Sequence, residues 1–311
     1  MNVLYLKYAV EIAKTGSINK AAENLYMAQP NLSRAIKELE NSLGIAIFER
    51  TSRGMILTQE GEMLLAHAER VLQSLDEMES MFRDGQMSKV TFSLSVPRSA
   101  YVYEAFSSFV DTLDTERKLE ITYKETNALD TIGNVYRGEC RLGILRYPEQ
   151  YSKQFQKALE EKNLRYELIA DFSKVLIVSK SHPLAEKKDV TEEDLLPYIE
   201  LYYADLFVPN VPLSDVKREE LGEEVGKKML IYDRASCFSF LKENEKVYFW
   251  SEPLTASYLE KNGLVMLSCK GKRRRYTDLF VYRKDYTLSK NDKEFLTKLC
   301  DVKRSYIPSE Y

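Results

Sequence analysis

Histidine and tryptophan are scarce in this chain of 311 residues, which holds two histidines and one tryptophan. His67 and His182 stand far apart, and neither belongs to a Ser/His/Asp, metal-ligand or phosphate-loop pattern. The sequence therefore disfavours an enzyme. We expect no catalytic residue, no metal site and no cofactor.

Cysteine is also sparse and scattered, with no CxxC pair among Cys140, Cys237, Cys269 and Cys300. This spacing argues against a zinc site and a disulfide framework, and it favours buried or idle thiols. No run approaches the roughly 20 apolar residues that span a bilayer. The N-terminus lacks a basic segment followed by an apolar one. These absences predict a cytoplasmic protein with no membrane partner.

The length and composition are those of a globular protein with more than one domain. A chain of 311 residues exceeds the size at which a single core keeps growing. Hydrophobic residues make up 44% and charged residues 30%, which is typical of ordered chains. The net charge of -3 does not exclude nucleic acid, because binding needs only a local basic face.

The first 58 residues favour three short helices followed by a hairpin. The first helix is expected to end at Gly16, and Ser17 is well placed to cap the second after a very short connection. Proline suits a first turn and glycine a helix end, so the third helix is expected to open at Gln29 and Pro30 and to end at Gly44.

The third predicted helix has an apolar face and a polar face. Steps of four, three and four residues define the face that we expect to be buried: Leu32, Ile36, Leu39 and Leu43. Amide, hydroxyl and charged groups lie outside that face: Gln29, Asn31, Ser33, Arg34, Lys37, Glu38 and Asn41. Such groups match the base-edge donors and acceptors of the major groove. The alternative is the solvated face of a plain packing unit.

A basic hairpin follows this helix. Residues 45–49 and 54–57 can pair, with Arg50, Ser52 and Arg53 at the tip, as in a wing that reaches DNA backbone or the minor groove. The residues that we expect to contact DNA are Ser17, Gln29, Asn31, Ser33, Arg34, Lys37, Arg50 and Arg53.

One long helix is predicted from Thr58, its cap, to about Arg83, a length of about 40 Å. Apolar residues recur along it at alternating steps of four and three, as in a coiled coil: Leu64, Ala68, Val71, Leu75, Met78 and Phe82. This seam favours dimerisation. In the alternative, it packs on the chain's own α/β domain.

After a break at 85–88, strand-like runs alternate with helical stretches. The expected strands are 91–96, 119–124, 142–145, 175–179, 199–203, 247–250 and 278–282. Alternation of strands and helices predicts an α/β domain built on mostly parallel sheet.

Open α/β sheets bind ligands at the carboxyl ends of their strands, so we expect a ligand site there. The candidate residues at these ends are Arg98, Ser99, Thr126, Asn127, Arg146, Tyr202, Tyr203 and Trp250. Ser99 precedes a helix, where backbone donors favour an anion. Two arginines and several phenols would suit a carboxylate on an aromatic ring. In the alternative, these are a helix cap, surface charges and half-buried core tyrosines.

Residues 16–62 resemble the DNA-binding segment of LysR-type transcriptional regulators. That family shares the pattern GS-x-x-x-AA-x-x-L, then QP-x-x-S-x-x-I-x-x-LE-x-x-LG, then LF-x-R and LT-x-x-G. The matching positions here are Gly16, Ser17, Ala21, Ala22, Leu25, Gln29, Pro30, Ser33, Ile36, Leu39, Glu40, Leu43, Gly44, Phe48, Arg50, Leu57, Thr58 and Gly61.

The rest of the chain is similar to the family more weakly, mainly through the SHPLA turn that ends at Ala185. Ala9 stands where the family usually has phenylalanine, and Gln59 where it often has proline. The family's glycine-rich stretch near the last sensing helix corresponds to 233–243, which contains no glycine.

The resemblance implies an α+β multi-domain protein in three parts. These are a winged helix-turn-helix DNA-binding domain (1–58), a linker and dimerisation helix (59–88) and a two-lobed α/β effector-binding domain like a periplasmic binding protein (89–311). It implies a sequence-specific DNA-binding regulator that senses a small molecule, and the arginines and phenols named above predict that this effector is an organic acid or aromatic carboxylate. The expected partners are double-stranded DNA, a small-molecule effector, further copies of the chain in a dimer or tetramer and, as a candidate, the transcription machinery. The alternatives are a constitutive DNA-binding regulator without an effector and an enzyme on the two-lobed fold.

Overall fold

The computed structural model describes residues 2–52, 54–83, 89–221, 226–271 and 275–307. Contacts divide the chain into two compact units. The N-terminal unit comprises Met1–Thr91 with Glu116–Glu120 and Tyr136–Cys140, and the C-terminal unit comprises the remaining segments. Among the described residues, no helix combines the length and hydropathy needed to cross a bilayer.

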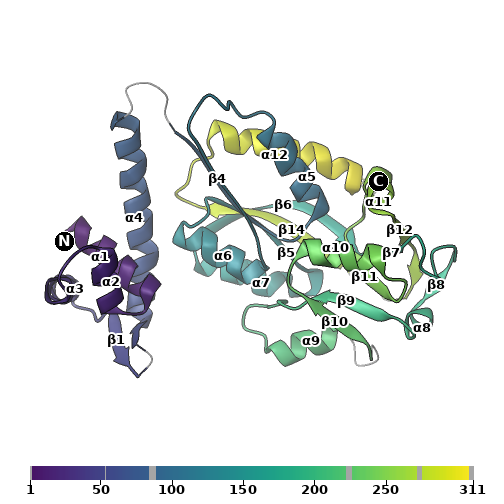
Figure 1. Ribbon diagram of the computed structural model, residues 1–311, viewed down its shortest axis with the longest axis horizontal. Coiled ribbons are helices and arrows are strands. Elements are labelled where there is room, and N and C mark those ends of the chain that lie inside the picture. Colours follow the sequence, from purple (N-terminus) through teal and green to yellow (C-terminus); the bar gives the residue numbers. More distant parts are fainter. Residues whose placement is uncertain (1, 53, 84–88, 222–225, 272–274, 308–311) are drawn as a thin grey trace. The chain divides into compact units, whose positions relative to one another are not determined.

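The N-terminal unit contains three short helices, a hairpin and a long helix (Figure 1). In chain order its elements are α1 (Val3–Thr15), α2 (Ile18–Asn24), α3 (Gln29–Leu43), β1 (Phe48–Thr51), β2 (Gly54–Leu57) and α4 (Gln59–Arg83). β1 and β2 pair antiparallel, with Arg50 opposite Met55 and Thr51 opposite Gly54. The predicted winged helix-turn-helix and the long helix are therefore confirmed.

Local capping explains where these helices begin and end. Ser17 accepts a hydrogen bond from the Lys20 backbone N–H, and the Thr58 hydroxyl accepts one from Gly61 N at 2.9 Å. Gly44 ends α3 with a left-handed φ of 70°, a conformation that glycine adopts without strain. The predicted caps are thus present in the structure.

The core of the N-terminal unit is formed by one face of each of α1, α2 and α3, together with Ile47, Phe48 and the first part of α4. Leu32, Ile36 and Leu39 are at most 5% exposed, as their spacing predicts. The prediction that Leu43 faces inward is wrong, because its side chain is 37% exposed. Leu43 is the last residue of α3, and Ala35 takes a buried place that the four-three-four spacing did not include.

Gly61 allows the first turn of α4 to pack closely on the hairpin. A Cβ at this position would lie 2.1 Å from the carbonyl oxygen of Ile47, a backbone atom that cannot move aside easily. We expect Gly61→Ala to lower the free energy of unfolding by about 1–3 kcal/mol, as overpacking does. Urea unfolding of the full chain measures this.

Gly226→Ala is the control, because a Cβ at Gly226 would meet nothing within 4 Å. We expect it to change stability by no more than about 0.5 kcal/mol. If Gly61→Ala stabilises the protein, as a glycine-to-alanine change does in an open helix, the close packing is contradicted.

The C-terminal unit has two mixed sheets, each the centre of one lobe (Figure 1). The first-lobe sheet has the order β4-β3-β5-β14-β6, formed by β4 (Leu119–Glu125), β3 (Val90–Val96), β5 (Leu142–Pro148), β14 (Arg275–Arg283) and β6 (Leu164–Ser173). The second-lobe sheet has the order β10-β9-β11-β7-β12, formed by β10 (Lys228–Ile231), β9 (Ile199–Tyr203), β11 (Val247–Ser251), β7 (Val175–Ser179) and β12 (Leu264–Leu267).

The prediction of mostly parallel sheet is wrong. β3 pairs parallel with β5, and β9 pairs parallel with both β10 and β11. β14 runs antiparallel to β5 and β6, and β7 runs antiparallel to β11 and β12. The chain passes to the second lobe after Ser173 and returns to the first through β14, so strands of opposite direction enter both sheets. The seven predicted strands are present; β6, β8, β10, β12 and β13 were not predicted.

Helices cover both sheets. They are α5 (Ala100–Val110), α6 (Ala128–Arg137), α7 (Ser152–Glu161), α8 (Glu192–Leu195), α9 (Leu213–Leu221), α10 (Arg234–Glu243), α11 (Ala256–Asn262) and α12 (Lys290–Tyr306). A 3-10 turn, η1 (Glu149–Tyr151), precedes α7, and β8 (Val190–Thr191) pairs with β13 (Cys269–Lys270) at one side.

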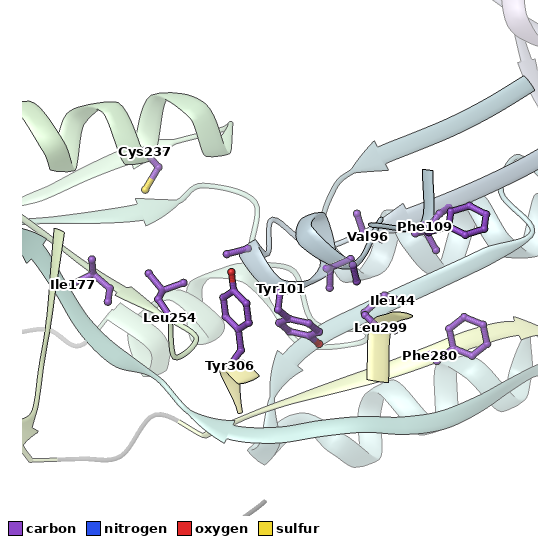
Figure 2. Packing of buried hydrophobic residues seen from close by; sticks show 14 of the residues in the cluster. Val96, Tyr101, Phe109, Ile144, Ile177, Cys237, Leu254, Phe280, Leu299 and Tyr306 are labelled. Atoms are coloured by element: carbon purple, nitrogen blue, oxygen red, sulfur yellow. The ribbon is translucent and has the colours of Figure 1, made fainter. Parts of the chain in front are cut away.

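Successive side chains of a strand point to opposite faces of the sheet, so one strand can contribute to two hydrophobic cores. In β14, Phe280 and Tyr282 join the main cluster with α5 and α12, whereas Leu279 and Val281 join a second cluster on the other face. Figure 2 shows the main cluster, in which Phe280 of the first lobe and Ile177 of the second take part. One apolar core therefore runs through both lobes.

Candidate functional site

The exposed face of α3 is the candidate DNA-binding surface. Asn31, Arg34 and Lys37 are exposed, and Gln29 and Ser33 are half-buried beside the first turn. The face opposite them is sealed in the N-terminal core by Leu32 and its neighbours. The geometry that DNA reading requires, polar groups turned outward from a well-anchored helix, is present.

Two contacts fix α3 against its neighbours. Glu40 Oε1 accepts the backbone N–H of Ile47 at 2.8 Å, which ties the helix to the start of the hairpin. The Tyr5 hydroxyl donates to Glu38 Oε2 at 2.8 Å, which holds that acid toward α1. The bond to the Glu38 carboxylate also raises the pKa of Tyr5.

Ser17 and the hairpin flank the surface. Ser17 is half-buried and its hydroxyl is used as the cap of α2, whereas Arg50 is exposed on β1. Arg53, also predicted to contact DNA, lies outside the described residues. Sequence reasoning gave no role to Tyr26, which is 97% exposed with a φ of 53° in the turn between α2 and α3.

The apolar stripe of α4 divides into two parts. Ala68 is 2% exposed in the core of the N-terminal unit, and Leu64 packs against that core. These two positions therefore stabilise the chain's own fold. Farther along, Val71 is 42% and Met78 49% exposed, with the half-buried Leu75 between them. The side chain of Phe82 lies outside the described residues.

The candidate effector cleft lies at the carboxyl ends of β3, β4, β5, β9 and β11, where a cavity of about 100 Å³ is found. Of the eight residues predicted for this site, seven line the cavity: Arg98, Thr126, Asn127, Arg146, Tyr202, Tyr203 and Trp250. Ser99 is fully buried beside them and hydrogen-bonds to two lining residues, Arg146 and Glu252. The structure thus brings all eight predicted positions together.

Arg98 is already paired within the chain. Its Nη1 and Nη2 donate to the two carboxylate oxygens of Asp205, each at 2.9 Å. The guanidinium also lies over the Tyr203 ring, 4.9 Å from its centroid. This bidentate ion pair uses the fork that would otherwise bind a ligand carboxylate.

Arg146 is also paired with acids of the chain. Nε and Nη2 donate to Asp278 at 2.8 and 2.7 Å, and Nη1 donates to Glu252 Oε2 at 2.7 Å. Burial alone would lower the pKa of Arg146, but Asp278 and Glu252 outweigh burial and raise it well above its ordinary value. The prediction of a carboxylate effector therefore finds no support in the contacts of either arginine.

The remaining predicted residues provide the rest of the cleft. Thr126 and Asn127 both donate to the Asp130 carboxylate, at 3.0 and 2.8 Å, and so fix the start of α6. Burial is the main reason that the pKa of the Tyr203 phenol lies well above its usual value, so this group stays neutral. Tyr203 packs edge to face with Phe249, which also lines the cavity.

Sequence reasoning missed the acids of the cleft. Asp205 and Glu252 lie just beyond the ends of β9 and β11, so extending the same loops by one or two residues would have found them. Asp278 is fully buried in the middle of β14. An acid inside an otherwise apolar run is itself a signal, because a buried carboxylate requires a partner.

The histidines and cysteines lie elsewhere. His67 is exposed on α4, and His182 is buried, with its ring centroid 4.4 Å from that of Tyr198. Cys140 and Cys237 are buried, and burial is the main cause that raises the pKa of the Cys237 thiol to about 12. Within the described part of the chain, no cluster of His, Cys, Asp and Glu has the composition of a metal site.

A winged helix-turn-helix, a long helix and a two-lobed α/β domain in a single chain form the architecture of a DNA-binding transcriptional regulator. Residues 4–62 match the model of the bacterial regulatory helix-turn-helix protein, lysR family. A probable RuBisCO transcriptional regulator of Thalassiosira pseudonana is 30% identical over 198 residues, 59% of each chain. The regulator BenM of Acinetobacter baylyi is 32% identical over 222 residues, 68% of this chain and 66% of BenM.

Among solved structures, full-length CbnR complexed with its target DNA has a TM-score of 0.58 at 16% identity, covering 97% of this chain and 100% of CbnR. At that identity the likeness shows a shared fold. The matched part of the chain spans 59% and 66% of the length of the two curated relatives. The chain belongs to the LysR family of transcriptional regulators.

Proposed function

We propose that the chain is a sequence-specific DNA-binding transcriptional regulator that reads the major groove with α3. The observation that carries this proposal is the exposed row of Asn31, Arg34 and Lys37 on a helix anchored through its other face. Amide and guanidinium groups recognise base edges, and lysine meets phosphate. The exposed Arg50 on the hairpin adds a contact to the backbone.

The proposal includes the three-part division 1–58, 59–88 and 89–311, with α4 joining two copies through Val71, Leu75 and Met78. The exposed apolar side chains on α4 support this assignment. Two copies would present two α3 helices to DNA. The proposed location of this regulator is the cytoplasm, where DNA and the transcription machinery are its proposed partners.

The C-terminal unit is the proposed sensor, and its cleft is the proposed effector site. A second candidate, a regulator that needs no effector, is favoured by the ion pairs that already join the lobes. Arg98 of the first lobe pairs with Asp205 of the second, and Arg234 of the second lobe lies 2.9 Å from Glu125 of the first. An enzyme finds no support in the cleft, since neither histidine lines it.

The test of DNA binding is fluorescence anisotropy with a mixture of genomic fragments at two salt concentrations. Because phosphate contacts release counterions, we expect affinity to fall steeply as salt rises from about 50 to 200 mM. A specific fragment should survive competition with random DNA. Weak, salt-insensitive binding to every fragment would contradict the proposed function.

A further inference from the structure

The Glu252 carboxylate occupies the position in the cleft that would attract the acid group of a ligand. Oε1 accepts hydrogen bonds from Ala100 N at 2.7 Å and from Ser99 Oγ at 3.0 Å. Oε2 accepts from Arg146 Nη1 at 2.7 Å and from Ser251 Oγ at 3.2 Å. Four donors therefore converge on one carboxylate that belongs to the chain itself.

These donors form a typical anion-binding site, in which a helix N-terminus and an arginine face the same anion. Ala100 begins α5, whose N-terminus carries a partial positive charge, and Arg146 adds a full one. Glu252 is 4% exposed, and burial alone would raise the pKa of its carboxyl. Arg146 and the Ala100 N–H outweigh burial and lower that pKa, so the group is ionised at neutral pH.

The surrounding charges leave no place for a second carboxylate. The cations of the cleft, Arg98, Arg146 and Lys174, are outnumbered by four acids, Glu200, Asp205, Glu252 and Asp278. Another anion would have to displace Glu252 or add to this excess of negative charge in a buried region, which like-charge repulsion disfavours. Glu252 follows β11 in the second lobe, whereas its partners Ala100 and Arg146 belong to the first. The same contact therefore also ties the lobes together.

We propose that Glu252 is an internal ligand that fills the anion site of the cleft and makes the cleft select against small carboxylates. Its removal exposes a site for a small carboxylate, formed by the Ala100 N–H, the Ser99 hydroxyl and the Arg146 guanidinium. This inference deepens the proposed sensor function and rests on it. A carboxylic acid is then excluded as the effector of the natural chain.

Acetate and the full-length chain provide the test. Glu252→Ala keeps Cβ and removes the CH₂–COO⁻ group, which acetate replaces. Trp250 is the only tryptophan of the sequence and lines the cleft, so its fluorescence reports binding there. Sodium chloride at equal ionic strength is the reference, and Glu243→Ala, which removes an exposed acid of the same lobe, is the matched control.

We expect acetate to leave the fluorescence of the natural chain and of Glu243→Ala unchanged relative to chloride. In Glu252→Ala it should produce a saturable change and raise the melting temperature, with acetate bound at least about tenfold more tightly than in the natural chain. A saturable change in the natural chain, or none in folded Glu252→Ala, would overturn the proposal.

If Glu252→Ala does not fold in chloride, its recovery as folded protein in acetate supports the proposal, and failure in both buffers contradicts it. The readout involves no DNA. A negative acetate result would therefore not contradict the proposed DNA binding. A negative DNA-binding result would likewise not change the interpretation of the acetate experiment.

Discussion

Replacement of Arg34 by alanine is expected to weaken specific DNA binding by about 1–3 kcal/mol, or about 5- to 150-fold, at each half-site. Arg34 is exposed on α3 and carries the planar fork that pairs with a guanine edge. Loss of that fork should also relax the choice of base at one position. Anisotropy titrations against the specific fragment and its single-base variants measure both effects.

Two further variants separate base reading from general electrostatics. Lys37→Ala removes a cation one turn farther along α3, and we expect it to lower affinity for all sequences and to reduce the salt slope by about one. Lys293→Ala removes an exposed cation from α12 in the other unit and should leave binding unchanged. Equal losses for Arg34→Ala and Lys293→Ala would mean that only net charge matters.

The second large effect is expected at Leu75. Glutamate there would place a charge in the apolar seam of both copies, and loss of a buried leucine alone costs about 2–5 kcal/mol. The dimer dissociation constant should rise by about a thousandfold or more, because two copies are affected. Light scattering should then report the mass of a single chain.

Ser74→Glu is the matched control for this substitution. It puts the same charge on the neighbouring, exposed residue of α4 and should keep the oligomer intact. An unchanged mass for Leu75→Glu would show that the seam is not the interface. A loss of mass in both variants would place the interface on a broader surface of α4.

The N-terminal unit could be predicted closely because its determinants are local. Ser17, Thr58 and Gly44 act on residues within one or two turns of themselves, so each cap can be recognised from its neighbours. The burial of Ala68 was harder to foresee. An apolar stripe has the same spacing whether it packs on the chain's own helices or on a second copy.

In the C-terminal unit, the position of the cleft could be predicted from local sequence, but its charge could not. The carboxyl ends of the strands located the cleft, since this follows from chain direction alone. The charge of the cleft depends on partners distant in sequence. Arg146 is 106 residues from Glu252 and 132 from Asp278, and no local pattern links them. Sheet direction was mispredicted because β14 returns from the second lobe into the first.

The central claim is that α3 reads bases, and selection from a random DNA library followed by footprinting tests it most directly. We predict that the full chain enriches one sequence and protects two half-sites whose centres are one helical turn, or a multiple of it, apart, with contacts in the major groove. Enrichment of no sequence over the starting library, with uniform protection along the DNA, would contradict the account.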